Sequence, residues 1–261
     1  NWTRADVAGI APIVAVPTTA GTGSEVGRAS VILDEAERVK KIIFHPKMIP
    51  AIVILDPMVT TGLPPMLTAA TGMDALSHSL EAWCSPAYHP MAEGIAVEGI
   101  RLVREYLPTA VASGSDVEAR TQMLVASMMG ATAFQRGLGA MHALAHPLGA
   151  LYNAHHGTLN AVLMPYVLIA NRQAIEPRII HLARSVDIPN ASFDSFLEWV
   201  LALRETVSIP QNLEDLGIDD NQADLIGKMA EVDPSGGTNP ILFDASQYQS
   251  IFMNALNGNL S

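Results

Sequence analysis

Basic residues and cysteine are scarce in this 261-residue chain, and each scarcity excludes a class of protein. The chain has 15 Lys and Arg against 26 Asp and Glu, and its formal net charge is −11. Proteins that bind nucleic acids neutralise phosphates with clustered Lys and Arg, so we expect no nucleic-acid partner. Cys84 is the only cysteine, which excludes an internal disulfide and fits a cytoplasmic location.

Long apolar runs are also missing, although apolar residues make up 49% of the chain. No stretch approaches the roughly 18–20 consecutive apolar residues of a membrane span, so we expect no membrane segment. The composition allows a sizeable core in one large or two modest domains. The sequence starts at Asn1 without a Met and soon enters an apolar run. We therefore expect the chain to begin part-way through a larger protein.

Strand-like patterns are confined to the beginning of the chain. They cover residues 10–16, 28–33, 39–44 and 51–55. The first and last of these are short, continuous apolar runs, which suit strands buried on both faces of a parallel sheet. The pattern predicts a sheet-containing portion over residues 1–62.

Helical spacing replaces strand patterns after residue 62. The predicted helices cover residues 66–84, 90–106, 115–134, 138–152, 158–170, 172–186, 192–207, 220–231 and 246–257. We expect the second to end before Pro108, and Ser115-x-x-Glu118 resembles a capping box for the third. Pro147 is expected to kink or restart its helix. The predicted fold class is therefore an α/β portion followed by a large all-α domain over residues 63–261, predominantly helical.

Four residues, Asp74, His78, His142 and His156, carry the strongest functional signal. Asp74 and His78 are four residues apart, as are His142 and His146, and such pairs share one face of a helix. Each residue alone could be a hydrogen-bonded core residue. Together they would carry a large desolvation cost unless they are paired or bind a metal. One carboxylate with three imidazoles suits a divalent transition metal with an open catalytic position.

The other histidines are expected to have structural or solvent-exposed roles. His45 and His89 each precede a proline in a loop, and His181 lies on a separate helix. His155 adjoins His156, and adjacent residues on a regular element point apart. Only one of these two is therefore expected to bind the metal.

A second signal is the segment P-T-T-A-G-T-G-S-E at residues 17–25, which follows a predicted strand. Its small residues let backbone N–H groups approach a ligand, and its hydroxyls add donors, so it suits a phosphate or nucleotide contact. A tight structural turn explains it equally well. Lys40 could add a positive charge, although a solvated surface position is the default for a lysine.

These motifs together resemble the iron-containing (group III) alcohol dehydrogenase family. The matching segments are P-T-T-A-G-T-G-S-E at 17–25, T-A-A-T-G-M-D-A-L-S-H at 68–78, L-G-A-M-H-A-L-A-H-P-L-G at 138–149, H-G-T-L-N-A-V-L-M-P at 156–165 and P-S-G-G-T-N-P at 234–240. The resemblance implies that residues 1–62 are the remnant of an α/β nucleotide-binding domain and residues 63–261 the helical metal-binding domain. A divalent metal, Fe2+ or alternatively Zn2+, would lie in the cleft between them.

The resemblance also implies an activity, a cofactor and a set of site residues. The activity is hydride transfer between a primary alcohol or aldehyde and NAD or NADP, and the family often forms homodimers. His146 matches a histidine beside the nicotinamide and the substrate, and we expect it to handle a proton. Ala29 and Phe134 would face the cleft. The implied metal ligands are Asp74, His78, His142 and His156, and the implied cofactor contacts are Thr18, Thr19, Gly21, Thr22 and Lys40.

The family's Gly-Gly-Gly-Ser-type pyrophosphate loop does not occur before residue 62. We therefore expect cofactor binding by this chain to be impaired or absent. Two other functions stay open. The same four side chains could activate water in a metal-dependent hydrolase or lyase, although residues 18–22 argue against this because a hydrolase needs no dinucleotide contact. The chain could also be a non-catalytic, metal-binding helical domain.

Overall fold

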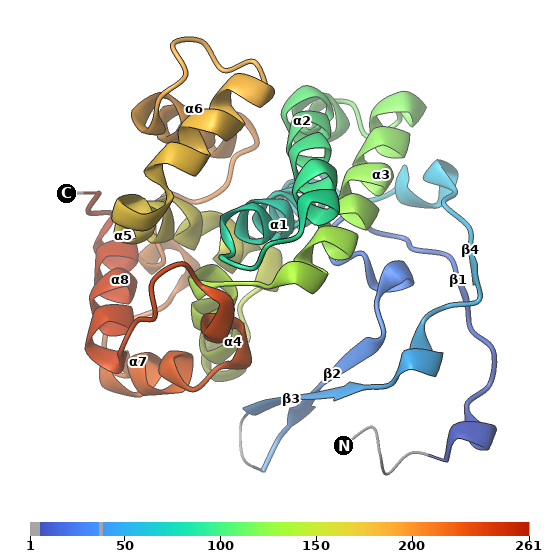
Figure 1. Cartoon of the computed structure of the whole chain (residues 1–261), viewed down its shortest axis with the longest axis horizontal. Coiled ribbons are helices and arrows are strands. Elements are labelled where there is room, and N and C mark those ends of the chain that lie inside the picture. Colours follow the sequence, from blue (N-terminus) through green and yellow to red (C-terminus); the bar gives the residue numbers. More distant parts are fainter. Residues whose placement is uncertain (1–5, 37–38, 261) are drawn as a thin grey trace.

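The computed structural model describes residues 6–36 and 39–260, and helices dominate it (Figure 1). Its strands come first: β1 (Val14–Ala15), β2 (Ala29–Asp34), β3 (Val39–Phe44) and β4 (Ile52–Val53). The longer helices follow: α1 (Pro65–Cys84), α2 (Pro90–Ala112), α3 (Val117–Ala133), α4 (Ala140–Tyr152), α5 (His156–Ser185), α6 (Phe193–Thr206), α7 (Ala223–Glu231) and α8 (Ala245–Asn257). The predicted fold class, a sheet-containing portion followed by a large helical part, is confirmed.

The strands form two separate pairs. β1 and β4 are parallel, with Val14 opposite Ile52, and β2 and β3 form an antiparallel pair. The burial predicted for the first and last strands was wrong, because Val14 is 57% exposed and Ile52 is 55% exposed. An apolar strand is buried only where another layer covers it. In this chain the helices pack on one another, and the strands lie at the edge of the molecule (Figure 1).

Two predicted helix ends were also wrong. α2 continues through Pro108, and α5 passes through residue 171 without a break. A proline inside a helix costs about 3 kcal/mol. The full burial of Leu107 beside Pro108 offsets much of that cost. Asn171 does not interrupt α5 because its side chain turns inward, where Nδ2 donates to the carbonyl of Val167 and to Oδ1 of Asn239.

The first residue of a helix depends on which nearby side chain caps it, and neighbouring residues such as Ser115 and Asp116 can both do so. Asp116, and not Ser115, caps α3, because its Oδ1 accepts from the backbone N–H of Ala119 at 2.9 Å. Pro147 lies inside α4 without restarting it. Capping boxes do occur at the starts of α6 and α8.

The central helix is α1, which packs against α2, α3 and α5. Every residue of α1 from Gly72 to Cys84 is buried. Polar side chains on this stretch are therefore enclosed by the helical core, where they must find partners within the protein. Among the helices that the structure describes, none is long and apolar enough to cross a membrane.

Candidate metal centre

Three helices bring the predicted site residues together. α1 carries Asp74 and His78, α4 carries His142 and His146, and α5 begins at His156. α5 packs on both α1 and α4. The i, i+4 spacing on α1 and α4 turns both members of each pair toward this junction.

Asp74, His142 and His156 each offer one ligand atom within 4.8 Å of the other two. Oδ1 of Asp74 lies 4.0 Å from Nε2 of His142 and 3.8 Å from Nε2 of His156. Metal bonds to these atoms are about 2.0–2.2 Å long, so two ligand atoms of one ion lie roughly 3–4 Å apart. The three side chains therefore stand at a separation that a single cation can bridge.

His78, the fourth residue predicted for the site, lies beside this group of three. Its Nε2 lies 3.9 Å from Oδ1 of Asp74, and its ring stacks on that of His142 with centroids 4.9 Å apart. Phe134 meets the same ring edge-on at 4.9 Å. Nδ1 of His78 is buried, and no described residue forms a hydrogen bond with it. A buried polar atom without a partner costs about 1–3 kcal/mol.

The surroundings of the cluster favour an ionised Asp74 and a neutral His142. Burial acts to raise the pKa of Asp74, but attraction to His78, His156 and His142 and a hydrogen bond from Asn160 lower it to about 2. Burial also holds the pKa of His142 well below its usual range, and repulsion from a charged His78 acts in the same direction. At neutral pH Asp74 is thus ionised and His142 neutral, as metal binding requires.

Asn160 connects the cluster and was missed by the sequence analysis. Its Nδ2 donates to Oδ1 of Asp74 at 2.8 Å and lies 3.2 Å from Nε2 of both His142 and His156. The amide nitrogen therefore contacts all three ligand atoms. Its position four residues after His156 on α5 is the sequence signal that could have found it.

Glu81 is the second residue that the sequence analysis missed. Its Oε2 lies 2.7 Å from Nδ1 of His142, and its Oε1 accepts from the backbone N–H of Met141 at 2.7 Å. Burial raises the pKa of Glu81 to about 7, even though these hydrogen bonds favour its ionised form. When ionised, Glu81 holds the ring proton of His142 on Nδ1 and leaves Nε2 as a lone pair near Asp74. Its spacing of three from His78 on α1 was the available signal.

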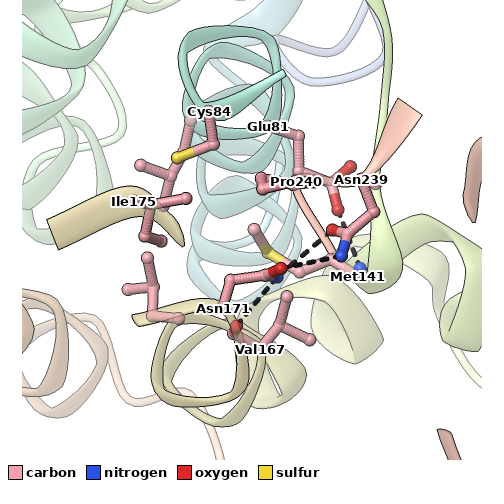
Figure 2. A pocket seen from close by; sticks show the side chains of 11 residues that line it. Glu81, Cys84, Met141, Val167, Asn171, Ile175, Asn239 and Pro240 are labelled. Carbon is pink, nitrogen blue, oxygen red and sulfur yellow. Dashed lines mark hydrogen bonds between the residues drawn. The ribbon is translucent and has the colours of Figure 1, made fainter. Parts of the chain in front are cut away.

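A small cavity lies beside Glu81 (Figure 2). Asn171 and Asn239 line it, and Nδ2 of Asn239 donates to Oδ1 of Asn171 at 2.8 Å. Oδ1 of Asn239 accepts from the backbone N–H of Ala140 at the start of α4. The cavity has a volume of about 10 Å³ and is too small for a substrate. These contacts instead hold the beginning of α4 against α1 and α5.

His146 lies beside the cluster. Its ring stacks on that of His156, with centroids 5.6 Å apart and planes 11° apart. Its Nδ1 lies 2.8 Å from Oδ2 of Asp233, a third partner that the sequence analysis did not predict.

The other histidines make structural contacts away from the cluster. Their rings cap the first turns of helices or pack against other rings. Nδ1 accepts a backbone N–H at the start of a helix in His45, His89 and His155. His181 stacks on Trp83, with ring centroids 5.6 Å apart. Because His155 caps α5, His156 alone of this adjacent pair faces Asp74.

The loop of residues 17–25 lies against the helices that carry the cluster. A Cβ on Gly21 would come within 2.8 Å of Thr71 on α1, three residues before Asp74. Gly23 has a φ of +63°, and a Cβ there would lie 2.2 Å from that of Ala131 on α3. These two glycines allow the close approach, because any side chain would push the loop outward.

The predicted cofactor contacts differ in how far they are exposed. Thr18 and Thr22 are exposed, Thr19 is half-buried, and Gly21 is buried against α1. Lys40 lies in β3, but its side chain falls outside the part of the chain that the structure describes.

A pocket of about 310 Å³ opens between this loop, the β2–β3 pair and the segment after α3. Thr22, Ala29 and Phe134 all line it. Because Phe134 also contacts the ring of His78, the pocket borders the cluster. Ala29 and Phe134, expected to face a common cleft, do line the same pocket.

Gly157 sets the distance between α5 and α1, and Gly157→Ala is expected to destabilise the chain. The new Cβ would lie 2.3 Å from the carbonyl oxygen of Ala70 and 3.2 Å from the Cβ of Asp74. Overpacking of this kind costs about 1–3 kcal/mol, and urea unfolding followed by circular dichroism measures it. Gly94→Ala on α2 is the control, because its Cβ would meet nothing within 4 Å. Equal unfolding midpoints for the two variants would contradict the prediction.

Two profiles of known protein families together match almost the whole chain. The family profile described as "Fe-containing alcohol dehydrogenase family, C-terminal" matches residues 68–256. A second profile, "Iron-containing alcohol dehydrogenase", matches residues 1–57. Both parts of the chain thus point to one family.

Individual relatives agree with these profiles. The chain is 41% identical to a 4-hydroxybutyrate dehydrogenase of Cupriavidus necator over 250 residues, which are 92% of this chain and 64% of that protein. It is 38% identical to alcohol dehydrogenase 4 of Saccharomyces cerevisiae, covering 94% of this chain and 65% of the yeast protein. The chain therefore spans slightly less than two thirds of the length of these relatives.

Solved structures share the fold. A 1,3-propanediol oxidoreductase superimposes with a TM-score of 0.90 at 38% identity, covering 94% of this chain and 66% of that one. A sulfoacetaldehyde reductase from Bifidobacterium kashiwanohense, solved in complex with NAD+, gives a TM-score of 0.86 at 30% identity and covers 94% and 64%. On the profiles, the relatives and the fold, the chain belongs to the iron-containing alcohol dehydrogenase family.

Proposed function

We propose that this chain carries the metal centre of an alcohol dehydrogenase that transfers hydride between a primary alcohol or aldehyde and NAD or NADP. The observation that carries the proposal is the convergence of Asp74, His142 and His156 within 4.8 Å in a member of this family. Relatives such as the methanol dehydrogenase of Bacillus methanolicus are named as NAD-dependent, which supports the choice of cofactor.

The donor set fits a divalent transition metal, Fe2+ or alternatively Zn2+. Asp74, His142, His156 and His78 would hold it, with Asp74 as the only anion. Bound there, the cation would supply Lewis acidity to the alcohol or carbonyl oxygen, and the nicotinamide would exchange the hydride. Glu81 keeps the ring of His142 in the required tautomer, and the buried surroundings limit competition from water.

His146 is proposed to accept a proton from the alcohol during oxidation and to return it during reduction. Imidazole suits this role because it changes charge near neutral pH. The stacking of its ring on that of His156 supports the assignment, because it puts the imidazole beside the cluster.

We assign the cofactor contacts to the loop that packs against α1, and this assignment includes Lys40 on β3. Exposed hydroxyls and closely approaching glycines support it. The residues concerned are Thr18, Thr19, Gly21, Thr22 and Lys40. The division into a nucleotide-binding portion (1–62) and a metal-binding portion (63–261), and a cytoplasmic location, belong to the same proposal.

The complete encoded protein is expected to reduce NAD+ or NADP+ when a primary alcohol is added, and absorbance of the reduced nicotinamide measures this. A chelator should abolish the activity and added Fe2+ or Zn2+ should restore it, because the proposed chemistry depends on the Lewis acidity of the metal. Absence of turnover with a series of primary alcohols and aldehydes, in metal-loaded protein, would overturn the proposal. Ester hydrolysis by the same sample would favour the hydrolase alternative.

A further inference from the structure

His146 and Asp233 form a hydrogen-bonded pair between α4 and the segment that follows α7. Nδ1 of His146 lies 2.8 Å from Oδ2 of Asp233, and the two side chains are only 16% and 13% exposed. An ionised carboxylate can only accept hydrogen bonds, so the shared proton sits on Nδ1. Whenever the ring is neutral, Nε2 on its opposite edge then carries the lone pair.

Asp233 is itself held in place. It caps the short helix η8 (Pro234–Thr238), where its Oδ1 accepts from the backbone N–H of Ser235 at 2.9 Å. Burial acts to raise the pKa of Asp233, but the hydrogen bond from His146 and those from Ser235 hold it below its usual range. The carboxylate is therefore ionised and fixed in orientation.

The same segment also holds the beginning of α4. Oγ1 of Thr238 donates to the carbonyl of Leu138 at 2.7 Å, and Oδ1 of Asn239 accepts from the backbone N–H of Ala140 at 3.0 Å. Residues 233–239 thus touch α4 at its start and again at His146. This double attachment gives the P-S-G-G-T-N-P motif a physical role, because it sets the position of Asp233 relative to the ring.

A pocket of about 160 Å³ lies against the pair, and both His146 and Asp233 line it together with Pro147 and Met229. It shares no lining residue with the pocket beside Phe134. Water occupies about 30 Å³ per molecule, so several molecules fit. His146 and Asp233 therefore border space for water on a side of the pair away from the residues that line the pocket beside Phe134.

We infer that Asp233 is a positioning residue that keeps the proton of neutral His146 on Nδ1 and so leaves Nε2 as the proton acceptor. The inference rests on the proposed role of His146. With a nicotinamide bound as the hydride acceptor, alcohol oxidation would break the O–H bond of the alcohol and form an N–H bond at Nε2 of His146. Asp233 stabilises the resulting imidazolium, and the ring regains its starting form when the Nε2 proton passes to water.

The tautomer of His146 tests this without any cofactor. In the ¹⁵N-histidine-labelled, metal-free chain at mildly alkaline pH, long-range ¹H–¹⁵N correlation spectra distinguish Nδ1–H from Nε2–H, and His146→Gln assigns the signals by their loss. The wild type should show Nδ1–H. Asp233→Asn should move the proton to Nε2, because the amide can donate to Nδ1, whereas Asp219→Asn should not. The inference is overturned if wild type and Asp233→Asn share one tautomer.

Kinetics of the complete encoded protein provide the second measurement. Asp233→Asn should lower kcat about 100-fold and alter its pH profile, while KM for the alcohol and metal content stay unchanged. Asp233→Glu should recover part of the loss, and thermal melting checks that all variants fold. An unchanged kcat and pH profile in Asp233→Asn would overturn the positioning role. If the wild type has no dehydrogenase activity, the proposed function fails, and the tautomer still decides whether Asp233 orients His146.

Discussion

Asp74→Ala is expected to leave the chain without a bound metal ion. Asp74 is the only anion among the proposed ligands, and its Oδ1 lies within 4.0 Å of an imidazole nitrogen of each of the other three. Loss of an outer-shell partner already costs about 10–100-fold in metal affinity, and loss of the central carboxylate should cost more. Elemental analysis of the purified chain measures the metal occupancy. Full metal occupancy in Asp74→Ala would contradict the assignment of Asp74 as a ligand.

Asp224→Ala is the matched control for that experiment. Asp224 lies on the surface of α7 and forms an ion pair with Lys228, so its loss should leave metal content unchanged. Unfolding curves with and without chelator add an independent readout. A ligand present at 100 times its Kd stabilises the folded state by about 2.7 kcal/mol, so chelation should destabilise the wild type and leave Asp74→Ala unaffected.

Glu81→Gln is expected to weaken metal binding about 10–100-fold although Glu81 would touch no metal. The amide oxygen can still accept from the backbone N–H of Met141, so the hydrogen bond that holds the start of α4 remains. The amide N–H, however, would donate to Nδ1 of His142. The ring proton then moves to Nε2 and blocks the atom that the metal needs. Competition of the chain with a chelator for Zn2+ measures the loss, and Glu98→Gln on the surface of α2 is the control.

The pH dependence of Zn2+ binding provides a further test of Glu81. Its pKa is raised to about 7, chiefly by burial. As the pH falls through 7, Glu81 takes up a proton and becomes a donor to His142, which has the same effect as glutamine. Wild-type affinity should therefore fall between pH 8 and 6 more steeply than that of Glu81→Gln. Parallel pH curves for the two proteins would rule out this role.

Local sequence was sufficient for α1 and α4, which carry three of the four proposed metal ligands. The start of α1 at Pro65 follows from the restricted backbone of proline, and its course follows from helical spacing. The i, i+4 rule on such helices was enough to pair Asp74 with His78 and His142 with His146. The predictions for the edge strands failed, because an apolar run does not reveal whether another layer covers it. Val14, at 57% exposed, illustrates this.

The sequence by itself indicated most of the helices, the residues proposed to bind the metal and the family to which the chain belongs. Only the tertiary structure decided which polar side chains form hydrogen bonds with the residues of the site. Glu81 meets His142 across 61 residues, Asn160 meets Asp74 across 86, and Asp233 meets His146 across 87. Helical periodicity relates residues that are three or four positions apart. Contacts across such separations arise only when α1, α4, α5 and the segment after α7 pack together.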